Sequence, residues 1–177
     1  MRPGTSVQAA SLAVALLLLA PAARADVLQS GPGGFAVQHR VVLALAPDKA
    51  WTRLGHIQEW WDPKHTYSGA SRNLSLRLSP GGCFCEKLSP GGFVKHMEVV
   101  LVRPREQLRL VGGLGPLQEL GVSGALTFDL APKDGRTEVT LTYRVSGSGT
   151  DGLEKLAAVV DQVLGEQLER YAAPATR

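Results

Sequence analysis

The segment from Asp151 to about Ala173 constrains the fold most, because it predicts one long amphipathic helix at the end of a strand-rich chain. Its apolar side chains recur at helical spacing and form a single stripe, with charged residues outside it. Asp151 and Glu154 have the pattern of a capping box, and Pro174 ends the helix. The stripe consists of Leu153, Leu156, Ala157, Val160, Val163, Leu164, Leu168 and Tyr171. It has to pack on another apolar surface.

Most of the preceding chain has the alternation of antiparallel strands. In Thr137–Val145 one parity is mostly apolar and the other polar, which is typical of a sheet with one face in water. Ser79–Gly82 and Ser89–Gly92 repeat the turn sequence SPGG, and Pro132–Gly135 is a hairpin signal. Strands are expected at 35–45, 74–78, 83–88, 93–102, 107–111, 122–130 and 137–145.

Between the first two of these strands, Pro47 and the helical spacing of Trp51, Leu54 and Ile57 predict two short helices, which Pro63 ends. The order of elements predicts an α+β fold. A curved antiparallel sheet of about six or seven strands surrounds the long helix. One helix cannot cover so large a sheet, so we expect a pocket between them.

The first 25 residues have the pattern of a secretory signal. Arg2 precedes the apolar run Ser11–Ala20, and Ala23-Arg24-Ala25 is a cleavage site of the A-x-A kind. The run is shorter than the roughly 20 residues of a membrane-spanning helix. We therefore expect a periplasmic or secreted protein that starts near Asp26, with no stable membrane insertion. The predicted organisation is a signal at 1–25, a flexible lead-in at 26–34, one domain at 35–173 and a tail at 174–177.

Charge and cysteine content exclude several classes of protein. Without residues 1–25 the chain has 17 basic and 16 acidic residues, and it has no basic cluster for nucleic acid. Cys83 and Cys85 lie about 6.6 Å apart on a regular strand, so we expect no strain-free bridge unless a bulge at Gly81-Gly82 shortens that distance. No metal motif accompanies these cysteines, and we expect neither a metal nor a cofactor.

Several motifs occur in combination along the domain. They are Val41–Trp51, with its Pro and Trp, Trp61-Asp62-Pro63, the turn Leu78–Phe84, the strand junction Val100–Leu110 around Pro104, and the glycine-containing Leu164–Leu168. Over residues 35–173 this combination resembles the helix-grip fold of the START-like, or SRPBCC, superfamily. The nearest branches are polyketide cyclase/dehydrase-like proteins and the activator domain of the ninety-kilodalton heat-shock-protein ATPase. The resemblance implies a cavity for a hydrophobic or amphipathic small molecule.

We expect the cavity to be lined from three parts of the chain. The mouth is assigned to Trp60, Trp61 and Tyr67, and the glycine-rich loop at 112–121 is expected to close over it. Gly165, in the middle of the long helix, suggests either close backbone approach or space for a ligand. The loop and helix contribute Leu114, Leu117, Val160, Leu164 and Leu168, and His39 is the expected polar group.

Three functions are consistent with these patterns. The leading interpretation is an exported protein that binds an apolar molecule without changing it. The alternative is a cyclase/dehydrase- or isomerase-like enzyme, in which His39 or His96 acts as a base and Glu98 orients His96. A further alternative is a protein-interaction module with a filled core and an exposed apolar patch. The enzyme requires a histidine within hydrogen-bond reach of a carboxylate and open to the pocket.

Overall fold

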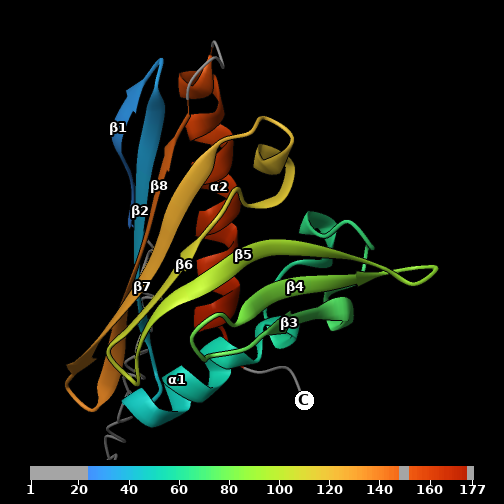
Figure 1. Cartoon of the computed structure of the whole chain (residues 1–177). Coiled ribbons are helices and arrows are strands. Elements are labelled where there is room, and N and C mark those ends of the chain that lie inside the picture. Colours follow the sequence, from blue (N-terminus) through green and yellow to red (C-terminus); the bar gives the residue numbers. More distant parts are fainter. Residues whose placement is uncertain (1–23, 148–151, 175–177) are drawn as a thin grey trace, which may run out of the picture.

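An antiparallel sheet bends around one long helix in the computed structural model, which describes residues 24–147 and 152–174. Figure 1 shows β2, β7 and β8 running along the helix α2, while β4 and β5 cross it. Along the sheet the order is β1-β2-β8-β7-β6-β5-β4-β3. The strands are β1 Arg24–Gly31, β2 Gly34–Leu43, β3 Leu74–Leu76, β4 Cys83–Leu88, β5 Gly92–Arg103, β6 Gln107–Val111, β7 Ser123–Lys133 and β8 Arg136–Ser146.

The helical elements follow the expected order. Pro47 stands in the first turn of α1, Asp48 lies near its positive end, and a short 3-10 turn, η1, comes after it. The α+β class, the antiparallel sheet and the long final helix of 20 residues are as predicted. The helices are α1 Pro47–Gly55, η1 Ile57–Glu59, η2 Pro63–His65, η3 Ser71–Asn73, η4 Gly115–Gln118 and α2 Leu153–Ala172.

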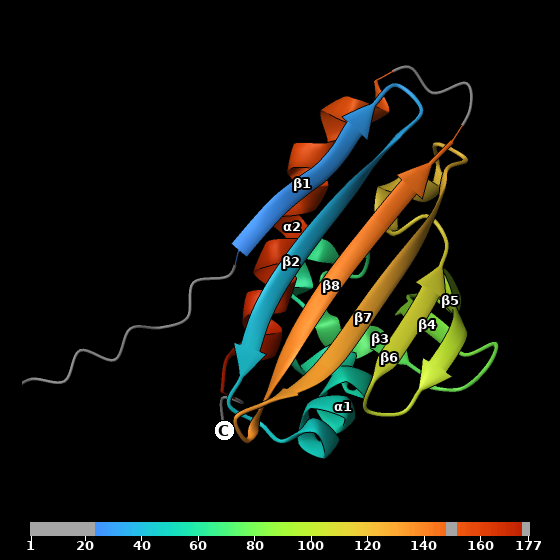
Figure 2. The same cartoon turned by 90° about the vertical axis from the view of Figure 1, so that its left-hand side faces the viewer.

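The observed sheet has eight strands, whereas six or seven were predicted. The additional strand is β1. The expectation of a flexible lead-in at 26–34 is wrong, because β1 pairs with β2 up to the turn between Gly31 and Gly34 (Figure 2). Its side chains from Val27 to Ser30 are exposed. An edge strand that buries none of these side chains needs no apolar alternation, and its backbone pairing with β2 holds it in place.

The helix α2 lies against β1 and β2 at one end of the sheet. The predicted cap Asp151 lies outside the described residues, and Gly152, with a positive φ of 93°, stands before the first helical residue, Leu153. Leu153, Leu164 and Leu168 are buried, as the stripe predicts. None of the described helices is long and apolar enough to span a membrane.

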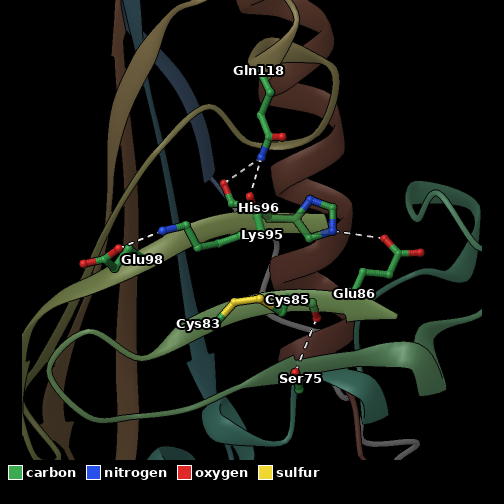
Figure 3. The surroundings of a disulfide bond; sticks show 8 residues. All are labelled: Ser75, Cys83, Cys85, Glu86, Lys95, His96, Glu98 and Gln118. Atoms are coloured by element: carbon green, nitrogen blue, oxygen red, sulfur yellow. Dashed lines mark hydrogen bonds and ion pairs between the residues drawn. A yellow bond between two sulfur atoms is a disulfide. The ribbon is translucent and has the colours of Figure 1, made fainter. Parts of the chain in front are cut away.

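A disulfide joins Cys83 and Cys85 on β4 (Figure 3). Our expectation of no bridge assumed a regular strand. The two Cα atoms lie 5.2 Å apart, and the pairing of β4 with β5 shifts register between Phe84 and Cys85. This irregularity shortens the separation from about 6.6 Å, near the upper limit for a disulfide, to a value close to the preferred separation of about 5.5–6 Å. The shortening occurs within the cysteine segment itself rather than at Gly81-Gly82.

Candidate functional site

A cavity of about 630 Å³ lies between α2 and the part of the sheet that the helix does not cover. Helix α2 packs on β1 and β2, and residues of its other side line the cavity together with Phe84 of β4 and His96 of β5. The loop that contains η4 and the segment that follows η2 complete the wall. The lining residues are Trp61, Lys64, His65, Thr66, Tyr67, Phe84, His96, Leu114, Gly115, Pro116, Leu117, Glu119, Leu120, Tyr143, Leu156, Val159, Val160, Val163 and Leu164.

Aromatic side chains form one wall of the cavity. Trp61 meets the ring of Phe84 edge-on at a centroid distance of 5.3 Å, and Phe84 contacts His96 at 4.9 Å. The ring of Tyr67 stacks on His96 at 5.9 Å. Aromatic contacts of this kind hold flat surfaces in fixed orientations. The wall therefore presents a largely apolar face with one imidazole in it.

The glycine-rich loop is held over the cavity by Tyr143. Its hydroxyl accepts a hydrogen bond from the backbone N–H of Leu114 at 3.0 Å and donates one to the carbonyl of Gly112 at 3.1 Å. Burial raises the pKa of Tyr143 to about 12, although the Leu114 N–H acts in the opposite direction. The neutral phenol thus remains available to donate and to accept at every pH where the protein is handled.

A β-bulge turns His96 toward the cavity. In the pairing of β4 with β5, Met97 lies opposite Phe84 and Lys95 lies opposite Cys85, so His96 is the extra residue. His96 and Met97 are consecutive and both buried, which a regular strand does not allow on a sheet with one wet face. Bulges re-aim side chains in this way next to functional sites.

The partner of His96 is Glu86 on the neighbouring strand. Nε2 of His96 lies 3.0 Å from Oε2 of Glu86, and the side chains are 4% and 0% exposed (Figure 3). The Glu86 carboxylate also accepts hydrogen bonds from the backbone N–H groups of Tyr67, at 3.1 Å, and of Ser68. These bonds connect the chain after η2 to β4 beneath the cavity.

The environment makes this pair a neutral imidazole beside a carboxylate. Burial acts to raise the pKa of Glu86, but hydrogen bonds from Ser68, Tyr67 and His96 outweigh it and lower that pKa below its usual value. Burial lowers the pKa of His96, and the nearby Glu86 carboxylate only partly opposes this. An ionised carboxylate only accepts, so Nε2 of His96 donates to it and Nδ1 carries a lone pair.

The lowered pKa of His96 predicts a pH dependence of stability. A histidine with a lowered folded pKa stabilises the protein fully above its unfolded pKa of about 6.5, and this contribution is lost as the pH falls below that value. The free energy of unfolding should therefore decrease between pH 7.5 and 5.5, by at most about 1.4 kcal/mol per pH unit for this proton. Urea unfolding of the unaltered protein and of His96→Phe at a series of pH values measures this dependence. An identical slope in both would contradict the assignment.

The structure brings six of the predicted pocket residues to the cavity wall. They are Trp61, Tyr67, Leu114, Leu117, Val160 and Leu164. Trp60 does not line the cavity. It is buried, packs on Tyr171 at a centroid distance of 5.1 Å and donates from Nε1 to the carbonyl of Arg53. Leu168 is also a core residue, so the turn of α2 that carries it lies beyond the cavity.

His39, the expected polar group of the cavity, lies elsewhere. It is buried between β2 and α2, with Nε2 located 2.8 Å from Oδ1 of Asp161. A Cβ atom on Gly165 would lie 2.9 Å from Cε1 of His39. Gly165 therefore reflects the close approach of His39 to the helix and not space for a ligand. The side chain of Gly165→Leu would contact His39 and would not project into the cavity. His39 is excluded as a base in this pocket.

Glu98 is not the carboxylate that orients His96. The bulge reverses the parity between them, so Glu98 faces solvent and pairs with Lys95 at 2.8 Å. Sequence reasoning missed Glu86. The sequence does indicate this residue, because strand alternation places Glu86 on the same face of the short strand as the aromatic Phe84. A charged residue on the apolar side of a strand is a candidate for a buried, paired carboxylate.

Within 24–147 and 152–174, no group of three or more His, Cys, Asp or Glu side chains is placed to hold a metal ion. Among the described residues, the buried polar pair at the cavity wall is His96 with Glu86. This pair can accept a hydrogen bond or a proton at Nδ1 of His96.

Comparison with known proteins identifies the fold. No family model matches the chain, and no curated protein matches it. Similar solved structures include protein MLL2253 from Mesorhizobium loti, with a TM-score of 0.56 and 19% identity over 77% of this chain and 93% of that one. CalU16 from Micromonospora echinospora has a TM-score of 0.52 and 13% identity over 87% and 88%.

A third similar structure is DynU16, a protein of the dynemicin biosynthetic locus. It matches with a TM-score of 0.52 and 21% identity over 77% of this chain and 45% of DynU16, so the match covers less than half of that protein. At such identities the likeness concerns the fold, which is the helix-grip type that the sequence motifs predict.

Proposed function

We propose that this protein binds a hydrophobic or amphipathic small molecule in the cavity between α2 and strands β4 and β5. The observation that carries the proposal is the cavity itself. Its volume of about 630 Å³ lies within the range of about 300–1,000 Å³ for ligand sites. Its wall is mostly aliphatic and aromatic, and its polar groups are few. A protein-interaction module would be expected to have a filled core at this position.

Ligand binding should raise the melting temperature. An apolar ligand at 100 times its dissociation constant adds about 2.7 kcal/mol of stability, or roughly 5–10 °C for a domain of this size. Thermal shift with fatty acids, isoprenoids and aromatic polyketides measures the effect. Val160→Trp should fill the cavity and abolish the shift, because Val160 lines it.

Ala158→Trp is the matched control for that experiment. Ala158 lies on the same helix but is exposed and outside the cavity, so its variant should keep the shift. The absence of any stabilising compound from all three classes in the unaltered protein would contradict the proposal. An equal loss of the shift in both tryptophan variants would place the ligand elsewhere.

The His96–Glu86 pair supports a second candidate function, an enzyme that moves protons. His96 is a cavity residue within hydrogen-bond reach of a carboxylate, which supports this hypothesis. Nδ1 of His96 would accept a proton from an activated C–H group of the substrate, and Glu86 would stabilise the imidazolium. Protein-dependent deuterium exchange into a 1,3-diketone, lost in His96→Phe, would support catalysis over binding alone.

We further propose that the protein is exported and is periplasmic or secreted. The support is the signal pattern of residues 1–25 together with the Cys83–Cys85 disulfide, since disulfides persist mainly in oxidising compartments. Amino-terminal sequencing of the protein recovered from the cell envelope or medium should give Asp26. Recovery of intact chain starting at Met1 from the cytosol would contradict it.

A further inference from the structure

The buried polar side-chain atoms of the described cavity wall are paired with protein partners, with one exception. The hydroxyl of Tyr143 both donates and accepts a hydrogen bond, and Nε1 of Trp61 donates to the carbonyl of His65 at 2.9 Å. Among the described residues that line the cavity, only His96 has a buried polar side-chain atom without a partner, and that atom is Nδ1. His96 is 4% exposed.

The contacts of the other ring nitrogen fix the chemistry of this atom. Nε2 of His96 is 3.0 Å from Glu86, whose carboxylate is held by the backbone N–H groups of Tyr67 and Ser68. The imidazole therefore donates through Nε2 and has its lone pair on Nδ1. A buried acceptor without a donor is unfavourable, so a ligand that supplies a donor regains free energy on binding.

We propose that the ligand of this cavity is a largely apolar molecule with one hydroxyl group, which donates a hydrogen bond to Nδ1 of His96. This inference rests on the proposed function, since it names the chemistry of the molecule in the same cavity. The aromatic rings of Trp61, Tyr67 and Phe84 contact the apolar body, and the bulge in β5 places His96 in the cavity wall.

The same geometry excludes other head groups at this position. An ionised carboxylate has no proton to donate to Nδ1, so the head group of a fatty acid is not the partner of His96. An ammonium group would be desolvated next to an imidazole whose carboxylate, Glu86, already accepts three hydrogen bonds. A neutral hydroxyl satisfies the acceptor without placing a new charge in the cavity.

Three matched fluorescent probes test this inference: pyrene, 1-methoxypyrene and 1-hydroxypyrene. All present the same apolar rings, and only 1-hydroxypyrene has a donor. In the unaltered protein, 1-hydroxypyrene should bind roughly tenfold more tightly than the other two, because it satisfies a buried acceptor. His96→Phe should still bind 1-methoxypyrene, with the ratio of affinities reduced to about one.

The control variant is His56→Phe, which replaces an exposed histidine outside the cavity wall and should retain the preference. Equal binding of all three probes by the unaltered protein would overturn the hydroxyl assignment and leave the proposed function standing. A preference that persists in His96→Phe would also overturn it. If no probe binds, both the cavity as an apolar binding site and the hydroxyl assignment are rejected. The comparison of probes in the unaltered protein decides the matter even where a variant fails to fold.

Discussion

Replacing Gly165 with leucine is expected to lower the free energy of unfolding by about 3 kcal/mol, near the upper end of the usual range for overpacking. A side chain at this position meets the imidazole of His39, with Cβ 2.9 Å from Cε1 and 3.2 Å from Nδ1. His39 is 1% exposed and lies between β2 and α2, so it has no open space to move into. The melting temperature should fall by roughly 6–12 °C, measured by calorimetry.

A double-mutant cycle provides the control. His39→Ala removes the obstacle, so the combination of His39→Ala with Gly165→Leu should be more stable than the sum of the two single effects predicts. Coupling energies between residues in contact are usually about 0.5–3 kcal/mol. A Gly165→Leu protein of normal stability that no longer binds ligand would contradict the prediction, since the leucine would then project into the cavity.

Replacing Glu86 with leucine should destabilise the protein by about 3–5 kcal/mol, because each of its buried donors that loses its acceptor costs about 1–3 kcal/mol. The carboxylate accepts from the backbone N–H groups of Tyr67 and Ser68 and from Nε2 of His96. Leucine fills similar space but leaves these buried donors without an acceptor. Urea unfolding measures the loss, and the segment after η2 should become susceptible to proteolysis first.

Glu98→Leu is the matched control, because Glu98 is the nearby glutamate on the outer face of the sheet, paired with Lys95. It should leave the urea midpoint unchanged within experimental error, since surface ion pairs contribute little. Equal midpoints for the two leucine variants would show that Glu86 does not hold the cavity wall together.

Periodicity predicts much of this fold. Alternation in Thr137–Val145 identifies β8, and the apolar stripe identifies α2, because each element buries one continuous face. The strand β1 was not predicted, since Val27–Ser30 bury no side chains and leave no apolar pattern. Its stability comes from backbone hydrogen bonds to β2, which any sequence of residues other than proline can make.

The cavity was predicted better than the polar group within it. Residues such as Leu114 and Val160 were placed on its wall because burial follows from the apolar pattern. The pairing of His96 was not predicted, because a bulge inserts one residue and exchanges the faces of every later position. Strand parity therefore assigned Glu98 to His96, whereas the cross-strand neighbour Glu86 is the true partner.

The position of β1 also sets an order of events for the proposed export. The bond between Ala25 and Asp26 lies inside this strand, where Ala25 is opposite His39 and Asp26 is opposite Gln38. A peptidase needs the scissile bond in an extended segment that can enter its active site, and pairing with β2 holds this segment in the sheet of the folded protein. For the proposed export, we therefore expect removal of the leader to precede the pairing of β1 with β2, and the chain to cross the membrane before its sheet is complete.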